Sequence, residues 1–324
     1  MKQPIAIVNN NPAFADLTCI DWNLGTLCNY ACSYCPERLH DGALKWPEPK
    51  VALRFCGAAI NHYQSLGRRT FFKFSGGEPT LYKHLIGLLR GVKELGGNAG
   101  LNSNASREPA WWDQAVDYLD HVVLTYHIEF SDTEHFVAVA NRLIEAGVVT
   151  HVNVPMLPER FDECAERASA LRSRCRGISL ALKPLLVDFK DQMYLYSHEQ
   201  KQAMQELAPA PAGEGASRTG MQCIYGDGTA RVAQTQDFIL REENYWRSWH
   251  CNAGIESLAI RADGGIYRAV CKQGGLLGNL ADRSYSFPAA PIRCAKDTCA
   301  CLADIKISKW RGENPALSVP QRQI

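Results

Sequence analysis

Short apolar runs alternate with helical patterns along most of the chain, from about residue 17 to residue 207. Runs of this kind, bounded by polar residues and glycines, are typical of buried strands. The expected strands are Leu17–Asn23, Thr70–Ser75, Asn98–Asn102, His121–His127, Thr150–Met156 and Ile178–Leu185. Six strands separated by helices predict an α/β fold with a mostly parallel sheet, as in a partial (β/α)6 TIM-like barrel.

The helices between these strands are indicated by their apolar period and their caps. One helix is expected to bury a single face, made of Phe161, Cys164, Ala168 and Leu171. Ser131 with Glu134, and Ser197 with Gln200, have the spacing of capping boxes at helix N-termini. Packing and capping account for these residues without any catalytic role.

A boundary is expected at Ala208–Gly220, because this segment has no apolar period and is rich in Pro, Ala and Gly. Beyond it, Ile255–Ala262 and Gly265–Val270 flank Asp263-Gly264, which is a strong signal for a β-hairpin turn. The predicted organisation is an N-terminal extension (1–14), a barrel (15–207), a linker (208–220) and a small C-terminal domain that contains the hairpin (221–324).

Charge and hydropathy argue against two broad classes of protein. The formal net charge is +1, which gives no electrostatic footprint for gripping a long phosphate backbone, so a bulk nucleic-acid binder is not favoured. The opening residues lack a basic region followed by an apolar run, and no segment of about 18 apolar residues occurs. We therefore expect a cytoplasmic protein with no membrane association.

Thirteen cysteines are many for a cytoplasmic chain, and an odd number cannot pair completely into disulfides. Metal or redox chemistry is therefore the better interpretation of the cysteine content. Some cysteines stand alone in apolar or helical surroundings, where a thiol usually behaves as a small hydrophobic group. They are Cys19, Cys56, Cys164, Cys175 and Cys223.

Three cysteines follow the first expected strand with the spacing C-x3-C-x2-C: Cys28, Cys32 and Cys35. Three thiolates at one strand end can hold three irons of a cubane cluster and leave the fourth iron without a protein ligand. A structural zinc site normally needs a fourth Cys or His, and His40 lies nearby in the sequence. Zinc therefore remains an alternative on this motif alone.

The segment CNYACSYC resembles the signature of the radical S-adenosylmethionine (SAM) superfamily, with Tyr34 at its aromatic position. The resemblance implies a [4Fe-4S] cluster whose open iron binds the amino and carboxylate groups of SAM. One electron, from an external donor such as flavodoxin or ferredoxin, then splits a carbon–sulfur bond. The resulting 5′-deoxyadenosyl radical abstracts a hydrogen atom from a substrate, in a site that must exclude water and oxygen.

A second match follows the next strand, where FSGGEPT supplies Gly76, Gly77, Glu78 and Pro79. In this family such a segment lies along the methionine part of SAM, and glycines allow the backbone to approach a ligand closely. By the same resemblance, Ser103 and Asn104 after the third strand are candidates to contact SAM.

Further candidates lie near the ends of later strands. The two-residue period of a strand puts Thr125 and His127 on one face, where both could meet SAM or substrate. Asn153 in the fifth strand could do the same. His127 and Lys183 are the candidates for a catalytic role, although each could equally be a satisfied residue of the barrel interior.

A second group of cysteines lies near the C-terminus: Cys251, Cys271, Cys294, Cys299 and Cys301. Folding about the hairpin turn brings the first two toward the same end of the ribbon. This region resembles the twitch or SPASM domains that hold an auxiliary [4Fe-4S] cluster, which implies four cysteine ligands. Cys251, Cys271, Cys299 and Cys301 are favoured, with Cys294 as a replacement, and four thiolates could also hold zinc.

The substrate is expected to be a small molecule or a peptide that is oxidised, rearranged or cross-linked. Only about fifteen residues precede the barrel, which leaves no obvious peptide-recognition domain and favours small metabolites. One alternative is radical modification or isomerisation of a nucleobase in nucleic acid, as in phage-type base hypermodification. The other is a non-catalytic iron–sulfur or zinc-binding module.

Overall fold

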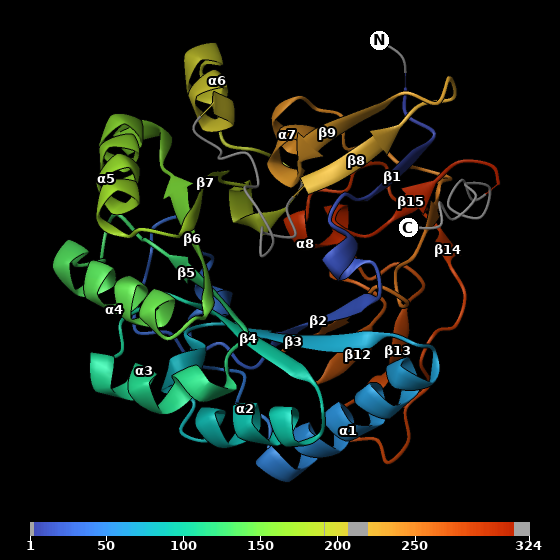
Figure 1. Ribbon diagram of the computed structural model, residues 1–324, viewed down its shortest axis with the longest axis horizontal. Coiled ribbons are helices and arrows are strands. Elements are labelled where there is room, and N and C mark those ends of the chain that lie inside the picture. The colour runs from blue at the N-terminus through green and yellow to red at the C-terminus, as the bar shows by residue number, and fades with distance from the viewer. Residues whose placement is uncertain (1–2, 191, 207–219, 314–324) are drawn as a thin grey trace.

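The computed structural model describes residues 3–190, 192–206 and 220–313. Its centre is a nine-stranded sheet in which six consecutive strands run parallel to their neighbours (Figure 1). These strands are β2 (Leu17–Asn23), β3 (Arg69–Ser75), β4 (Asn98–Ser103), β5 (His121–Thr125), β6 (Val149–Met156) and β7 (Ser179–Pro184). The predicted α/β fold with a mostly parallel sheet is confirmed.

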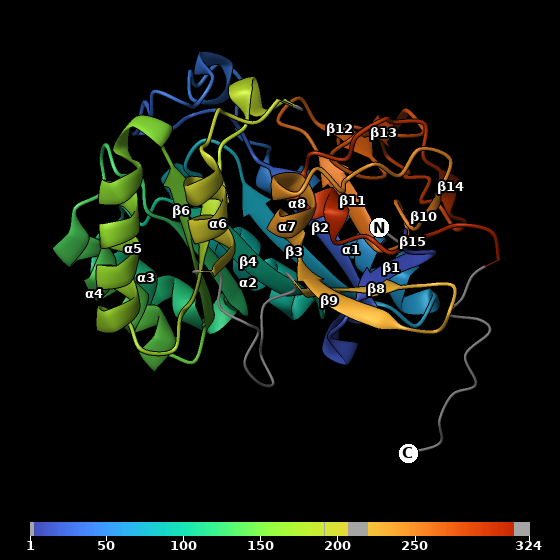
Figure 2. The ribbon, with the colours of Figure 1, turned by 90° about the horizontal axis from the view of Figure 1, so that it is seen from above.

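Helices cover the outer face of this sheet, as Figures 1 and 2 show from two directions. They are α1 (Pro49–Ser65), α2 (Leu85–Glu94), α3 (Pro109–Ala115), α4 (Thr133–Glu145), α5 (Phe161–Arg174) and α6 (His198–Glu206). The buried residues of α5 are the four predicted from its apolar period. On the outer face of β2, Trp22 packs edge-on against Phe55 of α1 with ring centroids 5.5 Å apart. The apolar core therefore lies between strands and helices, and the inner face of the sheet carries other residues.

The C-terminal part continues the barrel sheet. Strand β11 (Ser257–Ile260) pairs in parallel with β2 and forms a hairpin with β12 (Gly265–Tyr267), in which Ile260 lies opposite Ile266. The predicted hairpin is confirmed, and β13 (Leu276–Asn279) pairs with β12 beyond it. The six strands of the barrel thus become nine, because the hairpin adds to the free edge of β2.

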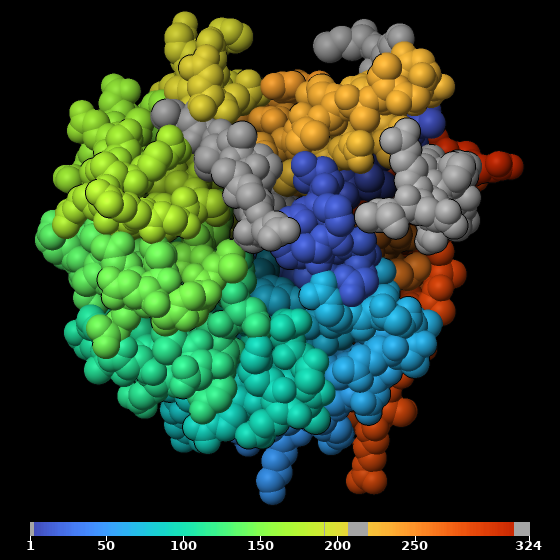
Figure 3. All heavy atoms as spheres, in the orientation of Figure 1, coloured from blue at the N-terminus to red at the C-terminus, as the bar shows by residue number. Residues whose placement is uncertain are grey.

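A second, six-stranded sheet joins the two ends of the chain. Its strands are β1 (Ala6–Asn9), β8 (Gly220–Ile224), β9 (Ala230–Gln234), β10 (His250–Cys251), β14 (Ile292–Arg293) and β15 (Lys309–Trp310). Strand β1 lies between β15 and β8, so residues of the expected N-terminal extension are part of this sheet. Figure 3 shows the blue N-terminal segment packed between the barrel and the orange strands.

The short helices α7 (Thr235–Leu240) and α8 (Leu302–Ile305) belong to this C-terminal part (Figure 2). Of the expected linker 208–220, Gly220 begins β8 and the rest lies outside the described residues. The division into domains remains a prediction. Within the described residues, no helix is both long enough and apolar enough to cross a membrane.

Two local predictions differ from the structure. Strand β5 ends at Thr125, so His127 is not a strand residue, because the chain turns there and Ser131 N–H donates to the His127 carbonyl. The N-cap of α4 is Asp132, whose carboxylate accepts from His135 N–H, whereas the Ser131 hydroxyl accepts from His127 N–H. The predicted capping box at Ser131 is therefore wrong, and the predicted capping box of Ser197 and Gln200 is confirmed.

Candidate active site

The first three clustered cysteines lie in the loop that follows β2, at the carboxyl end of the parallel strands. Cys32 is buried, Cys28 and Cys35 are half-buried, and all three are free thiols. Burial, with a smaller contribution from neighbouring thiols, raises the pKa of Cys32 to about 12 and that of Cys35 to about 11. Without a metal these thiols are protonated at neutral pH, and binding a metal would release their protons.

The Gly-Gly-Glu-Pro segment packs directly on this loop. Gly76 and Gly77 have φ values of 94° and 50°, and a Cβ on Gly76 would lie 2.0 Å from Asn23 Oδ1. A Cβ on Gly77 would lie 2.1 Å from the Leu27 carbonyl oxygen. Both positions thus need glycine for their backbone conformation and for the approach of the segment to the cysteine loop.

Glu78 is a buried carboxylate that ties the ends of β3 and β4 together. Its Oε1 accepts hydrogen bonds from Thr80 N–H at 3.0 Å, from the Thr80 hydroxyl at 2.6 Å and from the Ser103 hydroxyl at 2.9 Å. Its Oε2 accepts from Asn104 N–H at 2.7 Å, and burial raises the pKa of this carboxyl group. Asn104 also donates to Asn29 in the cysteine loop, at 2.9 Å. The carboxylate therefore holds the candidate SAM-binding segments in one frame, and Pro79 begins the short helical turn after it.

His127 reaches the cysteine loop from the other side of the barrel. Its Nδ1 lies 2.5 Å from the Tyr34 hydroxyl and 3.3 Å from Cys32 Sγ. The Tyr34 and His127 rings are nearly parallel, with centroids 6.1 Å apart, and burial lowers the pKa of His127 to about 4. A neutral imidazole thus joins the turn after β5 to the second cysteine of the motif.

The inner face of the sheet surrounds a cavity of about 1110 Å³. Thr125, His127, Asn153 and Lys183, which were predicted from strand ends, all line it, and so does Tyr34 of the cysteine loop. Barrel interiors are usually filled by branched apolar side chains. This interior instead carries charged and polar groups at alternating strand positions, and packing does not explain them.

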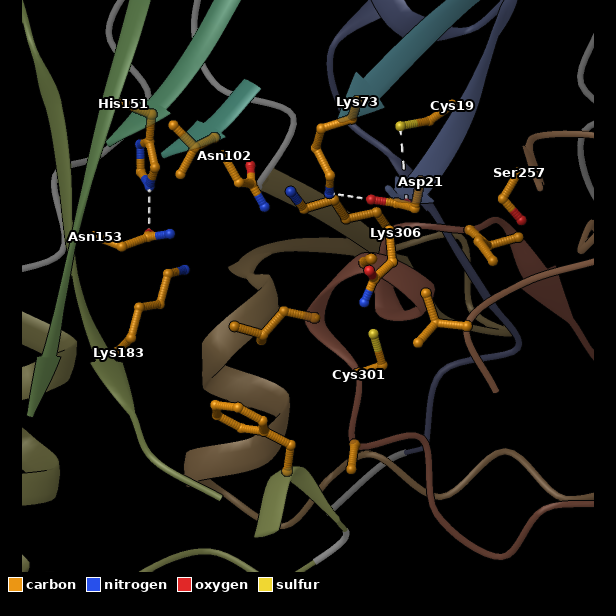
Figure 4. A pocket seen from close by; sticks show the side chains of 18 of the residues that line it. Cys19, Asp21, Lys73, Asn102, His151, Asn153, Lys183, Ser257, Cys301 and Lys306 are labelled. Carbon is orange, nitrogen blue, oxygen red and sulfur yellow. Dashed lines mark hydrogen bonds and ion pairs between the residues drawn. The ribbon is translucent and has the colours of Figure 1, made fainter. Parts of the chain in front are cut away.

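Sequence reasoning missed several of these polar residues: Asp21, Lys73, Asn102, His121, His151 and Lys306. Five of them lie in the expected strands, at positions that alternate with apolar ones, and this period was the available signal. Lys306 follows α8 in the C-terminal part, and no local pattern indicates that this residue enters the barrel (Figure 4).

Lys183 gives a stability prediction. Burial, together with the charges of Lys306 and Lys73, lowers its pKa to about 7. Because the unfolded chain binds more protons than the folded one between pH 7 and 10, the wild type should gain stability across this window. Lys183→Met should be more stable than wild type at pH 7, by up to roughly 4 kcal/mol. Anaerobic urea titrations at both pH values test this, and an advantage that does not shrink toward pH 10 contradicts it.

Four of the five C-terminal cysteines surround a small cavity beside the second sheet: Cys251, Cys271, Cys294 and Cys299. Trp246 and Trp249 are buried and line the same cavity, whereas Tyr245 is 54% exposed. Cys301 lines the barrel lumen instead, and Cys271 and Cys299 line both cavities. This arrangement favours Cys294 over Cys301 as the fourth member of the group.

Two buried charged residues, Asp304 and Lys309, lie beside this second cysteine group. Asp304 accepts hydrogen bonds from the N–H groups of Val270 and Cys271, and the buried Lys309 ammonium donates to three carbonyl oxygens. Burial raises the pKa of Cys251 to about 11 and that of Cys299 well above its usual value, and the Lys309 ammonium, opposite Cys251 between β15 and β10, offsets part of this increase. A nearby cation favours thiolates, which are the form that binds metals.

Neither cysteine group is arranged for one metal ion. Across the described residues, no three His, Cys, Asp or Glu side chains are arranged to hold a single ion. All ligands of one zinc ion lie within about 2.3 Å of it, so their sulfur atoms crowd together. Thiolates on different irons of a cubane stand farther apart, and both donor sets are of the type that such clusters use.

Comparisons with known proteins match these features. Residues 22–171 fit the family model described as the radical SAM superfamily. No curated protein matches the chain. The solved structure of native anSMEcpe with bound AdoMet aligns with a TM-score of 0.52 at 15% identity, over 82% of this chain and 78% of that one.

Two further solved structures align over similar lengths. A histidine-tagged form of anSMEcpe with bound AdoMet has a TM-score of 0.50 at 14% identity, over 82% of this chain and 74% of that one. SuiB from Streptococcus suis, bound to S-adenosylmethionine, has a TM-score of 0.48 at 15% identity, over 84% of this chain and 63% of that one. The anSMEcpe sequences are only 14–15% identical to this chain, so their structural similarity shows a common fold and nothing beyond it.

Proposed function

Because residues 22–171 match the radical SAM superfamily model, we propose that this chain is a radical SAM enzyme that uses SAM to remove a hydrogen atom from a small organic substrate held in the barrel lumen. Such an enzyme uses a [4Fe-4S] cluster and SAM. The observation that carries the proposal is the meeting of three free thiols, the Gly-Gly-Glu-Pro segment and a large polar lumen at the carboxyl ends of the strands.

Cys28, Cys32 and Cys35 are proposed to bind three irons of the cluster and to leave the fourth iron for SAM. The bound cluster would supply the electron that splits SAM into methionine and a 5′-deoxyadenosyl radical, with flavodoxin or ferredoxin as external donor. His127 and Tyr34 would close the loop on its lumen side, since Tyr34 stacks on His127 beside Cys32. Their burial would keep water from the reacting atoms.

SAM is proposed to lie along Gly76–Pro79, beside Ser103 and Asn104, with Thr125 toward its lumen side and Asn153 placed to meet either SAM or the substrate. The Glu78 carboxylate already accepts four hydrogen bonds, so its proposed role is to hold this frame. The SAM ammonium would then meet backbone groups of the segment. His127 and Lys183 remain the proposed residues for contact with reacting groups.

Spectroscopy tests this proposal. Adding SAM to the anaerobically reduced enzyme should change the electron paramagnetic resonance spectrum of the cluster, because SAM binds the open iron. Methionine alone, added as a control at the same concentration, should produce a weaker change. A spectrum that SAM leaves unaltered contradicts the proposed site.

A second [4Fe-4S] cluster is proposed at Cys251, Cys271, Cys294 and Cys299. The shared small cavity, the free thiols and the Lys309 ammonium support this ligand set. A cluster at this position would supply an electron acceptor behind one wall of the lumen, since Cys271 and Cys299 line both cavities. We therefore favour oxidation of the substrate as the outcome of hydrogen abstraction.

Iron counting distinguishes the possible ligands. A variant with Cys28, Cys32 and Cys35 replaced by alanine should keep about four irons per chain. Adding Cys294→Ala should remove most of this iron, whereas adding Cys301→Ala should leave it. The reverse pattern contradicts the ligand set, and retained zinc without iron rejects a second cluster.

A small molecule is the favoured substrate because of the size of the lumen. Small-molecule sites span roughly 300–1,000 Å³. The cavity of about 1110 Å³ must also accommodate part of SAM, which leaves room for a compact second ligand.

A further inference from the structure

The barrel lumen carries a basic residue, Lys183, that packing does not explain. We propose that Lys183 and Asn153 form a subsite for an oxyanion of the substrate, a carboxylate or a phosphate group. This inference rests on the proposed function, because it names the class of molecule on which that site acts: a small organic acid or phosphate ester. The two residues lie on the neighbouring strands β7 and β6, and their side chains enter one cavity (Figure 4).

Lys183 is the first reason for this assignment. Its ammonium group enters the lumen and makes no hydrogen bond or ion pair with any described residue. Burying a charge costs free energy unless a partner of opposite charge compensates it. An anionic ligand would supply this compensation, and the lowered pKa of Lys183 agrees with a partner that arrives only on binding.

The orientation of Asn153 is the second reason. The Ser179 hydroxyl lies 2.6 Å from His151 Nδ1, and His151 Nε2 lies 3.0 Å from Asn153 Oδ1. Burial lowers the pKa of His151 well below its usual value, so the ring is neutral and carries one hydrogen. Because Nε2–H donates to the amide oxygen, the amide nitrogen of Asn153 faces the lumen beside Lys183 as a donor.

The balance of charge in the lumen is the third reason. Lys73 forms an ion pair with Asp21 on the neighbouring strand. The other acidic side chains that line the cavity already bind basic residues: Asp120 binds Lys93, and Asp188 binds Arg38 and Lys190. Among the described residues, none of the acidic side chains that line the lumen pairs with Lys183, which suits an anionic ligand there.

Binding of probe anions to the holoenzyme tests the proposal. Equilibrium dialysis with radiolabelled inorganic phosphate and with radiolabelled succinate, both in the presence of SAM, measures the two kinds of oxyanion separately. The wild type should bind at least one probe saturably, and Lys183→Met should weaken that binding roughly tenfold or more, as expected for one lost charge-assisted hydrogen bond. The tighter probe identifies which oxyanion the site prefers.

Matched variants separate recognition from damage to the fold. Lys183→Arg should retain most of the affinity because it keeps the charge, and Lys83→Met, at an exposed lysine far along the chain, should bind as the wild type does. Asn153→Asp should weaken both probes, because its carboxylate would compete for Lys183. Equal binding by Lys183→Met and Lys83→Met, or no saturable binding by the wild type, overturns the subsite.

The two proposals fail in different ways. Cleavage of SAM by the same wild-type preparation reports on the proposed function without reference to the anion. If the wild type cleaves SAM while Lys183→Met binds both probes unchanged, the subsite is wrong and the proposed function stands. If the wild type leaves SAM intact, the proposed function is wrong whatever the anion binding shows.

Discussion

Cys32→Ala should abolish SAM cleavage, with 5′-deoxyadenosine formation falling roughly a thousandfold or more, to the background rate. Cys32 is the buried member of the first cysteine group and contacts His127 at 3.3 Å. Two thiolates cannot hold a cubane that needs three, so the iron content should fall by about four per chain. Liquid chromatography of the quenched reaction measures the nucleoside, and colorimetry measures the iron.

Cys175→Ala is the matched control for this change. Cys175 is a buried free thiol at the end of α5 and belongs to neither cysteine group. Its replacement should cost about 1 kcal/mol of stability and leave both iron content and SAM cleavage unchanged. Cleavage that persists in Cys32→Ala at the wild-type rate would remove this thiol from the proposed cluster.

Glu78→Ala should have the second largest effect, a fall of about 100-fold in SAM cleavage. The change removes a carboxylate that accepts four hydrogen bonds and leaves the Ser103 hydroxyl and Asn104 N–H without their partner. The ends of β3 and β4 would then lose their common frame beside the cysteine loop. Initial rates at saturating and limiting SAM separate weaker binding from slower cleavage.

Two milder variants should reduce SAM cleavage by smaller amounts. Ser103→Ala removes one of the four hydrogen bonds and should reduce cleavage by about fivefold. Glu78→Gln keeps the shape but turns an amide N–H toward Asn104 N–H, so its rate should fall between those of the other two variants. A Glu78→Ala enzyme that binds and cleaves SAM normally contradicts the framing role.

The barrel could be predicted from the sequence because its determinants are local. Short apolar runs marked each strand, and the four apolar residues of α5 gave its buried face. The Ser131 cap was misplaced by one residue, because Asp132 competes for the same helix end and accepts from His135. The extent of the sheet was not predictable, since β11 adds to β2 from more than 200 residues away.

The residues of the candidate site were likewise only partly predictable from the sequence. Motifs along the chain identified the three N-terminal thiols and the Gly-Gly-Glu-Pro segment as candidates, but not the inward position of Lys306. The choice between Cys294 and Cys301 also depends on tertiary structure, because their spacing is compatible with either one as ligand. Residues that act together but follow no regular spacing along the sequence can be identified only in the folded chain.

Product analysis of the wild type tests the central claim most directly. Anaerobically reconstituted enzyme, incubated with SAM and dithionite, should form 5′-deoxyadenosine and methionine in equal amounts. Omission of either the reductant or the iron should prevent formation of both products. SAM that remains intact under strong reduction, in protein shown to contain its cluster, would contradict the assignment of this chain as a SAM-cleaving enzyme.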